Sequence, residues 1–220
     1  MPGSPDPPGA AVALQLKAKG LRDPRTLKAI ARFDRRRFLP PEERQRALAD
    51  EAVPIGLGQT ISQPYMVGLM TVALELTGAE KVLEVGTGSG YQSAILSALA
   101  AEVYSVERLA TLSLRARGML DGLGVENVRY RVGDGSLGWP EAAPFDRILV
   151  AAGSPVMPPA LFAQLREGGL LLVPVGDEVG QRLTLFRKVE GRPVVKELIA
   201  CRFVKLIGAG GWDFGEDWAT

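Results

Sequence analysis

Closely spaced glycines and two acids follow three successive segments that have the pattern of strands. Gly86, Gly88 and Gly90 come directly after "KVLEV", Glu107 ends "EVYSVE", and Asp134 follows "NVRYRV". Glycines at the end of a strand let the backbone turn tightly and let a ligand approach the amides of the next helix. Acids at the carboxyl ends of parallel strands can accept hydrogen bonds from a nucleotide. Together these residues predict a nucleotide site.

The spacing of the glycines limits which nucleotide this is. A dinucleotide fingerprint needs a third glycine where Tyr91 stands, and the Gly-Lys-Ser/Thr of a P-loop is absent. Glu84, two residues before the first glycine, suits a cationic nucleotide that carries an amino acid. Glu107 could accept from both ribose hydroxyls, and Asp134 from an adenine amino group. Each feature alone is also typical of a turn or a solvated strand end, but their order favours S-adenosylmethionine.

Composition excludes several other chemistries. The 220 residues contain no histidine and a single cysteine, Cys201. A zinc site or a Ser-His-Asp triad is therefore not expected, no metal is predicted, and the lone cysteine suits the cytoplasm. The net charge of +1 shows no nucleic-acid footprint. No apolar run reaches the roughly 18 residues that a membrane helix needs.

The order of the expected elements indicates the fold class. From Lys81, short apolar segments alternate with helical ones of 10–15 residues, which predicts βαβ units. We therefore expect an α/β fold with a doubly wound, mostly parallel, Rossmann-like sheet. The segment "QRLTLFRKVEGRPVVKELIA" predicts two strands around Glu190-Gly191, an antiparallel hairpin at one edge.

The same patterns divide the chain. We expect a disordered tail over 1–10 and a single domain over 11–208, with helices in 11–50, a loop over 53–63 and a helix after it that stops at Gly78. The cofactor-binding core spans 80–176, with one helix in "PPALFAQLREGG", and the C-terminal hairpin and strand span 181–208. Residues 209–220 form a tail whose aromatic residues are compatible with docking on the domain.

One loop is more specific than the glycine motif. From about Leu16 to Gly208 the chain resembles the protein-L-isoaspartate O-methyltransferases. The matching segments include "PIGLGQTISQPYM" (residues 54–66), "VLEVGTGSGYQSA", "VYSVER", "VGDGSLGWPEAAPFDRILVAAG", "QLREGGLLLVPVG" and "CRFVKLIG". Many methyltransferases share the glycine loop, so the segment with Gly-Gln-Thr-Ile-Ser-Gln-Pro carries the identification.

This resemblance implies methyl transfer from S-adenosylmethionine to the free α-carboxylate that isomerised aspartyl residues expose in damaged proteins. The ester then favours a succinimide, whose hydrolysis returns some normal aspartate, so the activity is protein repair in the cytoplasm. The resemblance gives Ser62 the active-site role and Thr60 a neighbouring contact. Other expected contacts are, for the cofactor, Glu84, Gly86, Thr87, Gly88, Ser89, Gly90, Glu107, Arg108, Gly133, Asp134, Gly135 and Tyr65, and for the substrate, Gln59, Ile61, Gln181 and Thr184.

Two positions depart from the family pattern. Tyr65 stands where the family usually has a histidine associated with the cofactor, and Lys205 stands where a proline is common. Alternatives therefore stay open at this point. Ser62 could simply cap the helix before Pro64. The chain could methylate another carboxylate or RNA, or it could bind the cofactor without turnover. We favour damaged proteins as partners, without nucleic acid or membrane, and a monomer.

Overall fold

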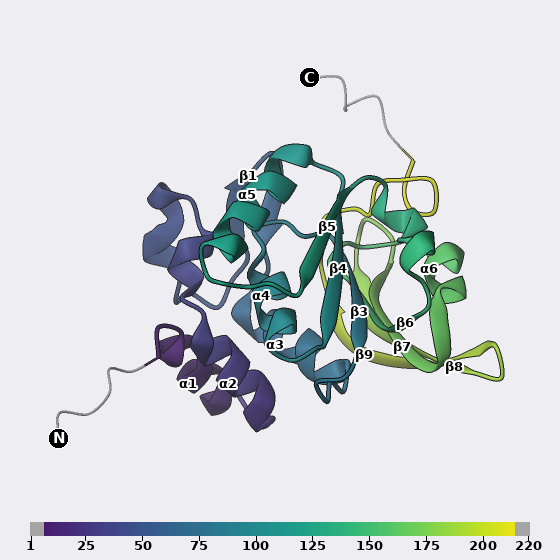
Figure 1. Ribbon diagram of the computed structural model, residues 1–220, viewed down its shortest axis with the longest axis horizontal. Coiled ribbons are helices and arrows are strands. Elements are labelled where there is room, and N and C mark those ends of the chain that lie inside the picture. The colour runs from purple at the N-terminus through teal and green to yellow at the C-terminus, as the bar shows by residue number, and fades with distance from the viewer. Residues whose placement is uncertain (1–6, 214–220) are drawn as a thin grey trace.

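The computed structural model describes residues 7–213, which fold around a seven-stranded sheet (Figure 1). Its strands are β3 (Lys81–Val85), β4 (Glu102–Glu107), β5 (Val128–Val132), β6 (Phe145–Val150), β7 (Leu165–Gly176), β8 (Gln181–Val189) and β9 (Arg192–Cys201). They lie in the order β5-β4-β3-β6-β7-β8-β9. Strands β3 to β7 pair in parallel, whereas β8 and β9 add antiparallel to the edge. The predicted doubly wound, mostly parallel sheet with its antiparallel edge hairpin is confirmed.

Helices cover both faces of this sheet. They are α1 (Ala10–Ala18), α2 (Pro24–Arg32), α3 (Pro64–Ala73), α4 (Tyr91–Ser97), α5 (Ala110–Asp121) and α6 (Pro159–Ala163), with 3-10 turns at Arg35–Phe38, Pro41–Arg46, Gly135–Leu137 and Pro140–Ala142. Figure 1 shows α3, α4 and α5 on one side of the sheet and α6 on the other. Helices α1 and α2 form an outer layer that packs on α3 and α4. Within residues 7–213, no helix is long and apolar enough to cross a membrane.

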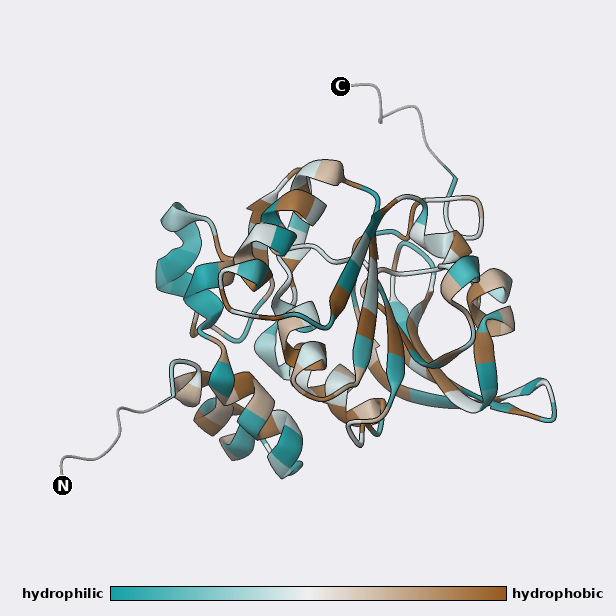
Figure 2. Cartoon of the chain, viewed as in Figure 1, coloured by the Kyte–Doolittle hydropathy of each residue, from teal (hydrophilic) through white to brown (hydrophobic). Residues whose placement is uncertain are grey.

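Strand β7 shows why the sheet needs cover on both faces. Its side chains alternate, so that Leu170 and Leu172 pack with Met70 of α3 while Leu171 packs with Phe162 of α6. A parallel sheet buried on both faces has strands that are apolar throughout. Figure 2 shows hydrophobic segments in the inner strands of the sheet, interrupted by hydrophilic ones.

The segment 53–63, which we expected to be a loop, contains a small hairpin. Strands β1 (Val53–Gly56) and β2 (Gln59–Ile61) pair antiparallel around Leu57 and Gly58. Both turn residues have positive φ, 54° and 67°, as the favoured two-residue hairpin turns require. Leucine rarely takes this conformation, and no Asn-Gly or Asp-Gly dipeptide marks the turn, so the pattern predicts a loop instead.

Two predicted helices are too long. Helix α3 ends at Ala73 rather than at Gly78, because Glu75 takes a left-handed conformation with φ 51°. Helix α6 ends at Ala163, and the residues after it join β7, which starts at Leu165. The register between β6 and β7 shifts over this stretch, and an irregularity absorbs the extra residues. Within 11–50, where we expected helices, residues Pro41–Arg46 form only a 3-10 turn.

The ends of the chain lie partly outside the described residues. Of the tail predicted over 1–10, residues 1–6 lie outside, and Ala10 already begins α1. Of the tail predicted over 209–220, residues 214–220 lie outside. Trp212 does dock on the domain, since its Nε1 donates to the carbonyl of Gly153 at 2.9 Å.

Candidate active site

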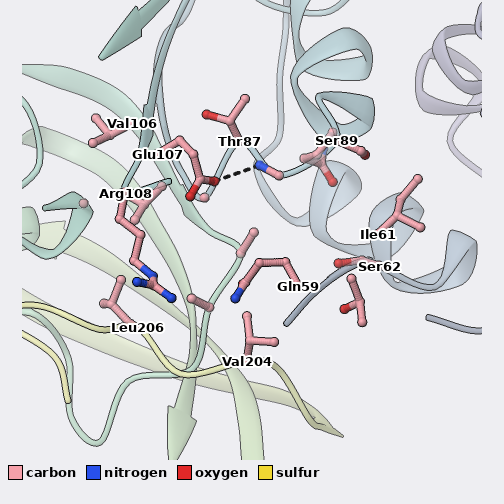
Figure 3. A pocket seen from close by; sticks show the side chains of 18 of the residues that line it. Gln59, Ile61, Ser62, Thr87, Ser89, Val106, Glu107, Arg108, Val204 and Leu206 are labelled. Carbon is pink, nitrogen blue, oxygen red and sulfur yellow. Dashed lines mark hydrogen bonds between the residues drawn. The ribbon is translucent and has the colours of Figure 1, made fainter. Parts of the chain in front are cut away.

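A pocket opens at the carboxyl ends of β3, β4 and β6, where the strand order reverses direction. Short segments line it: 59–62, 85–89, 91–92, 106–108, 151–152 and 204–207, with Val67 and Gly135. Its space is about 790 Å³, which includes solvent at its open mouth. Figure 3 shows side chains from these separate segments facing one space. The pocket therefore occupies the topological switch point, where open α/β sheets bind ligands.

The glycine loop forms one wall of this pocket. Gly86, Gly88 and Gly90 all have positive φ, at 94°, 53° and 85°. A Cβ at Gly90 would lie 2.6 Å from Leu120 Cδ1, so this glycine also lets α5 pack against the loop. Gly86 and Gly88 line the pocket, where the missing side chains leave room for a ligand against the backbone.

Glu107 connects the loop to the end of β4. Its Oε2 accepts from the amide of Gly88 at 2.9 Å, shown dashed in Figure 3, and its Oε1 accepts from the amide of Leu109 at 3.0 Å. The side chain is 6% exposed and lines the pocket. A carboxylate has about four lone-pair sites, so each oxygen can accept one more hydrogen bond. Glu107 thus fits a ligand with a pair of hydroxyl groups.

Glu84 lies below the loop rather than in the pocket. It is completely buried, and its Oε2 accepts from the hydroxyls of Ser93 and, at 2.6 Å, Ser105. Ser105 in turn lies 2.6 Å from the hydroxyl of Thr87, which lines the pocket. Oε1 has no hydrogen-bond partner. Burial raises the pKa of Glu84 to about 7, the charge of Glu107 adds to the rise, and the two serine hydroxyls oppose it. Glu84 supports Thr87 from behind through Ser105 and does not line the pocket.

This environment predicts that Glu84→Gln stabilises the protein at high pH. Unfolded glutamate loses its proton near pH 4.5, whereas the folded protein holds it until about pH 7. The ionisation of Glu84 therefore lowers stability progressively between these pH values. Above pH 7 the variant should have a free energy of unfolding about 3 kcal/mol higher than the parent's, and this advantage should vanish toward pH 4.5.

Urea unfolding at pH 5 and pH 8 measures this difference. Glu102→Gln, on the neighbouring strand β4, is the control, because Glu102 is partly exposed and pairs with the exposed Arg129. A stability difference for Glu84→Gln that is the same at both pH values would contradict the assignment.

The hairpin segment presents hydroxyl groups to the pocket. Thr60 is exposed on β2, and Ser62 follows the strand, half-buried, with both in the pocket lining. Ser62 does not cap α3, which corrects that alternative. The helix begins at Pro64 with Gln63 at the cap position, and the carboxylate of Asp50 accepts from the amide of Tyr65 at 2.8 Å. The hydroxyl of Ser62 is thus not used to start the helix.

A second hollow adjoins the first. Its space is about 840 Å³, open solvent included, and it shares Thr60, Ser62, Ala151 and Val204 with the glycine-loop pocket. Its own lining comes from residues 50–52, Gln63, Met66 and residues 200–203. Thr60 and Ser62 therefore line both hollows, and transfer between two bound molecules needs groups that are placed between them in this way.

The structure gathers most of the expected site residues. Those that line the glycine-loop pocket are Gln59, Thr60, Ile61, Ser62, Gly86, Thr87, Gly88, Ser89, Glu107, Arg108 and Gly135. Those outside its lining are Tyr65, Glu84, Gly90, Gly133, Asp134, Gln181 and Thr184. Three of the residues outside the lining, Tyr65, Asp134 and Gln181, make contacts elsewhere in the fold.

Tyr65 points away from the ligand space. It is half-buried in the first turn of α3 and packs against the hydrophobic cluster that the N-terminal helices form with α4 and α5. The replacement of the family's usual histidine by tyrosine therefore puts no new side chain into the pocket.

Asp134 holds the C-terminal segment. Its Oδ1 accepts from the amide and hydroxyl of Ser136, and its Oδ2 accepts from the amide of Ala209 at 2.8 Å. A Cβ at Gly208 would lie 2.0 Å from this carboxylate, so the two segments meet closely. Its neighbour Gly135, not Asp134 itself, reaches the pocket.

Gln181 also holds a segment that lines a hollow, in this case residues 200–203 of the second hollow. Its Oε1 accepts from the amide of Phe203 at 2.8 Å, which fixes the chain just before Val204. Thr184 is buried, and its hydroxyl donates to the carbonyl of Arg182. Gly153 and Ser154 make strand-like bridges to Lys205 and Val175.

Sequence reasoning missed the wall formed by residues 204–207. Lys205 lines the pocket but directs its ammonium to Glu178, at 2.6 Å, and over the ring of Trp212. The match of "CRFVKLIG" to the family could have indicated this wall, but the resemblance gave these residues no contact with cofactor or substrate. Asp50 was missed as well, because its partners in α3 follow only from the tertiary fold.

Comparison with known proteins identifies relatives over nearly the whole chain. Residues 9–210 match the model of the family described as Protein-L-isoaspartate(D-aspartate) O-methyltransferase. The chain is 54% identical over 207 residues to Protein-L-isoaspartate O-methyltransferase 1 of Anaeromyxobacter sp. (strain Fw109-5), covering 92% of this chain and 97% of that protein. It is 52% identical to Protein-L-isoaspartate O-methyltransferase 2 of Geotalea uraniireducens, covering 92% and 94%.

Solved structures agree with this result. A protein-L-isoaspartate O-methyltransferase structure superposes with a TM-score of 0.82 at 31% identity, covering 91% of this chain and 66% of that one. A putative protein-L-isoaspartate O-methyltransferase from Plasmodium falciparum, in complex with S-adenosyl-L-homocysteine, superposes with a TM-score of 0.79. It covers 89% of this chain and 96% of that one, and its 22% identity supports the fold alone.

Proposed function

The chain belongs to the protein-L-isoaspartate(D-aspartate) O-methyltransferase family, and from this premise we propose which of its residues carry the reaction. It is an S-adenosylmethionine-dependent enzyme that methylates the free carboxylate of isoaspartyl residues in damaged proteins. The resemblance, the enzyme class and the cofactor expected from the sequence are confirmed. The family membership favours this activity over the alternatives of another carboxylate, RNA, or cofactor binding without turnover, and the peptide assay below tests them.

One observation carries the assignment of roles: Thr60 and Ser62 lie between two adjoining hollows. We assign the glycine-loop pocket to the cofactor and the second hollow to the isoaspartyl peptide. Residues 59–62 then lie at the boundary across which the methyl group moves, with Gln59 and Ile61 flanking the two hydroxyls.

The cofactor side of this assignment rests on the glycine loop and Glu107. The pocket fits a nucleotide because Glu107 can accept two further hydrogen bonds while it holds Gly88. We propose ribose contact for Glu107, with the other contacts from Gly86, Thr87, Gly88, Ser89, Arg108 and Gly135. Glu84, Asp134 and Gln181 support these residues from outside the lining.

Methyl transfer to a carboxylate requires the protein mainly to align the two reactants. S-adenosylmethionine supplies an electrophilic sulfonium methyl when bound. A carboxylate has a reference pKa near 4 and is already ionised at pH 7, so no general base is needed and the absence of histidine is no obstacle. The hydroxyls of Ser62 and Thr60 can donate to one carboxylate oxygen and leave the other to attack. Such alignment contributes up to roughly 7–11 kcal/mol to catalysis.

The setting of the reaction is also a proposal. We place the enzyme in the cytoplasm, which the single cysteine supports, without a nucleic-acid partner, which the net charge of +1 supports. A monomer remains our prediction, and sedimentation measures it directly.

The function is tested by the transfer of labelled methyl to two peptides. They differ only in one residue, L-isoaspartate in one and L-aspartate in the other. We expect label in the isoaspartyl peptide alone. Label in neither peptide, with S-adenosylhomocysteine still bound in calorimetry, would contradict the assigned activity and leave the cofactor site standing.

A further inference from the structure

Arg35 is an unusual buried cation. It begins the 3-10 turn Arg35–Phe38 and is 1% exposed. Among the ion pairs of residues 7–213, none includes Arg35. Burying a charged group costs free energy unless other polar groups compensate it. The compensation here comes from backbone carbonyls.

The guanidinium binds carbonyls from two separate parts of the chain. Its Nη1 donates to Ala47 at 2.9 Å, and its Nη2 donates to Glu51 at 3.1 Å. The same Nη2 donates to the carbonyl of Ser62 at 3.2 Å. Arg35 therefore joins the segment 46–51 to the residue whose hydroxyl lies between the two hollows.

Asp50 holds the chain on the other side of Ser62. Its Oδ1 accepts from the amide of Tyr65, and Gln63 Nε2 donates to its Oδ2 at 3.2 Å and to its carbonyl at 2.8 Å. The backbone of residues 62–65 is thus attached at both ends to residues 35–51. We call residues 35–51 the strap.

We propose that Arg35 is a positioning residue for methyl transfer, which fixes the place of the Ser62 hydroxyl by binding the Ser62 carbonyl. This inference rests on the proposed function of Ser62. The strap itself, apart from Asp50 and Glu51 at its end, lies outside both hollows. Its effect on the reaction passes through the backbone, and a misplacement of about 1 Å can cost roughly 100-fold in rate.

The shape of the guanidinium explains why arginine is needed. Its donors form a rigid planar fork that can reach several carbonyls at once, whereas lysine offers a single ammonium on a flexible stem. A lysine at this position keeps the charge and loses the simultaneous contact with Ala47, Glu51 and Ser62. Arg35→Lys therefore tests the positioning and leaves the charge unchanged.

The matched control is Arg147→Lys. Arg147 is a partly buried arginine of β6 that also donates to backbone carbonyls, those of Leu74 and Asp146. It does not line either hollow. The same substitution there removes similar hydrogen bonds at a site away from Ser62.

Three quantities are measured in both variants: kcat and KM for the isoaspartyl peptide, S-adenosylhomocysteine affinity, and amide hydrogen exchange. For Arg35→Lys we expect kcat to fall at least tenfold while cofactor affinity changes less than threefold. Exchange should accelerate at residues 59–63 and stay unchanged at 81–85. Arg147→Lys should keep both kcat and the exchange at 59–63.

An equal loss of kcat in the two variants, or unchanged exchange at 59–63 in Arg35→Lys, would overturn the proposal. If Arg35→Lys does not fold, Asp50→Asn loosens the same attachment from its other side; because Asp50 lines the second hollow, this variant is judged by the exchange at residues 59–63 alone. If the parent enzyme does not methylate the isoaspartyl peptide, the proposed function fails, and the exchange measurement alone decides this inference.

Discussion

Glu107→Ala is expected to raise the dissociation constant for S-adenosylhomocysteine at least 100-fold. The substitution removes the proposed ribose acceptors and also releases the amide of Gly88, which Glu107 holds at 2.9 Å. A hydrogen bond to a charged group contributes about 1.5–3 kcal/mol, so the loss of two corresponds to roughly 100-fold or more. Isothermal titration calorimetry measures the change.

Glu102→Gln is the control for this experiment. It changes an acid on the same strand, β4, but at the end away from the pocket. Its cofactor affinity should equal that of the parent. Unaltered affinity in Glu107→Ala would show that the ribose assignment is wrong, whereas a weakened Glu102→Gln would indicate a general effect on β4.

Local sequence patterns were sufficient to predict the sheet. Short apolar strands, glycine-rich ends and helical segments follow one another from Lys81, and each one appears in the fold at its expected place in the order. The antiparallel turn at Glu190-Gly191 was also predicted. In the structure both residues take positive φ, at 52° and 72°, as a two-residue hairpin turn requires. These features depend on neighbours in the chain, which a sequence displays directly.

Element ends and side-chain directions were less predictable. The residues next to Glu84 in the sequence do not indicate that its carboxyl group lies under the glycine loop. There it accepts from Ser93 and Ser105 instead of lining the pocket. The same holds for Asp134, whose partner Ala209 lies 75 residues further along the chain. Contacts of this kind arise only when distant segments pack. The sequence therefore indicated that Glu84 and Asp134 belong to the site region, but it did not indicate which groups they contact.

Arg35 illustrates the same limit. An arginine among "DRRRF" has the pattern of a solvated basic run, and its neighbour Arg36 does pair with Asp34 on the surface. Only the fold shows that Arg35 turns inward to the carbonyl of Ser62. The family resemblance pointed to the segment that contains Ser62, and the three-dimensional structure shows which residues hold its backbone.

Ser62→Ala is expected to lower kcat by roughly 10- to 100-fold while S-adenosylhomocysteine affinity stays within twofold. The hydroxyl is proposed to donate to the substrate carboxylate, and losing one hydrogen bond to a charged group costs about 1.5–3 kcal/mol. The cofactor keeps Glu107 and the glycine loop, so its affinity depends little on this hydroxyl. Steady-state kinetics with the isoaspartyl peptide, together with calorimetry, separates the two effects.

The control for Ser62→Ala is Ser97→Ala at the end of α4. The hydroxyl of Ser97 donates to the carbonyl of Ala94, outside both hollows, so its loss should leave kcat unchanged. Because Ser62 also lines the second hollow, KM for the peptide should rise in Ser62→Ala along with the fall in kcat. An unchanged kcat would remove the hydroxyl from the mechanism and leave Thr60 as the remaining donor at the boundary between the two hollows.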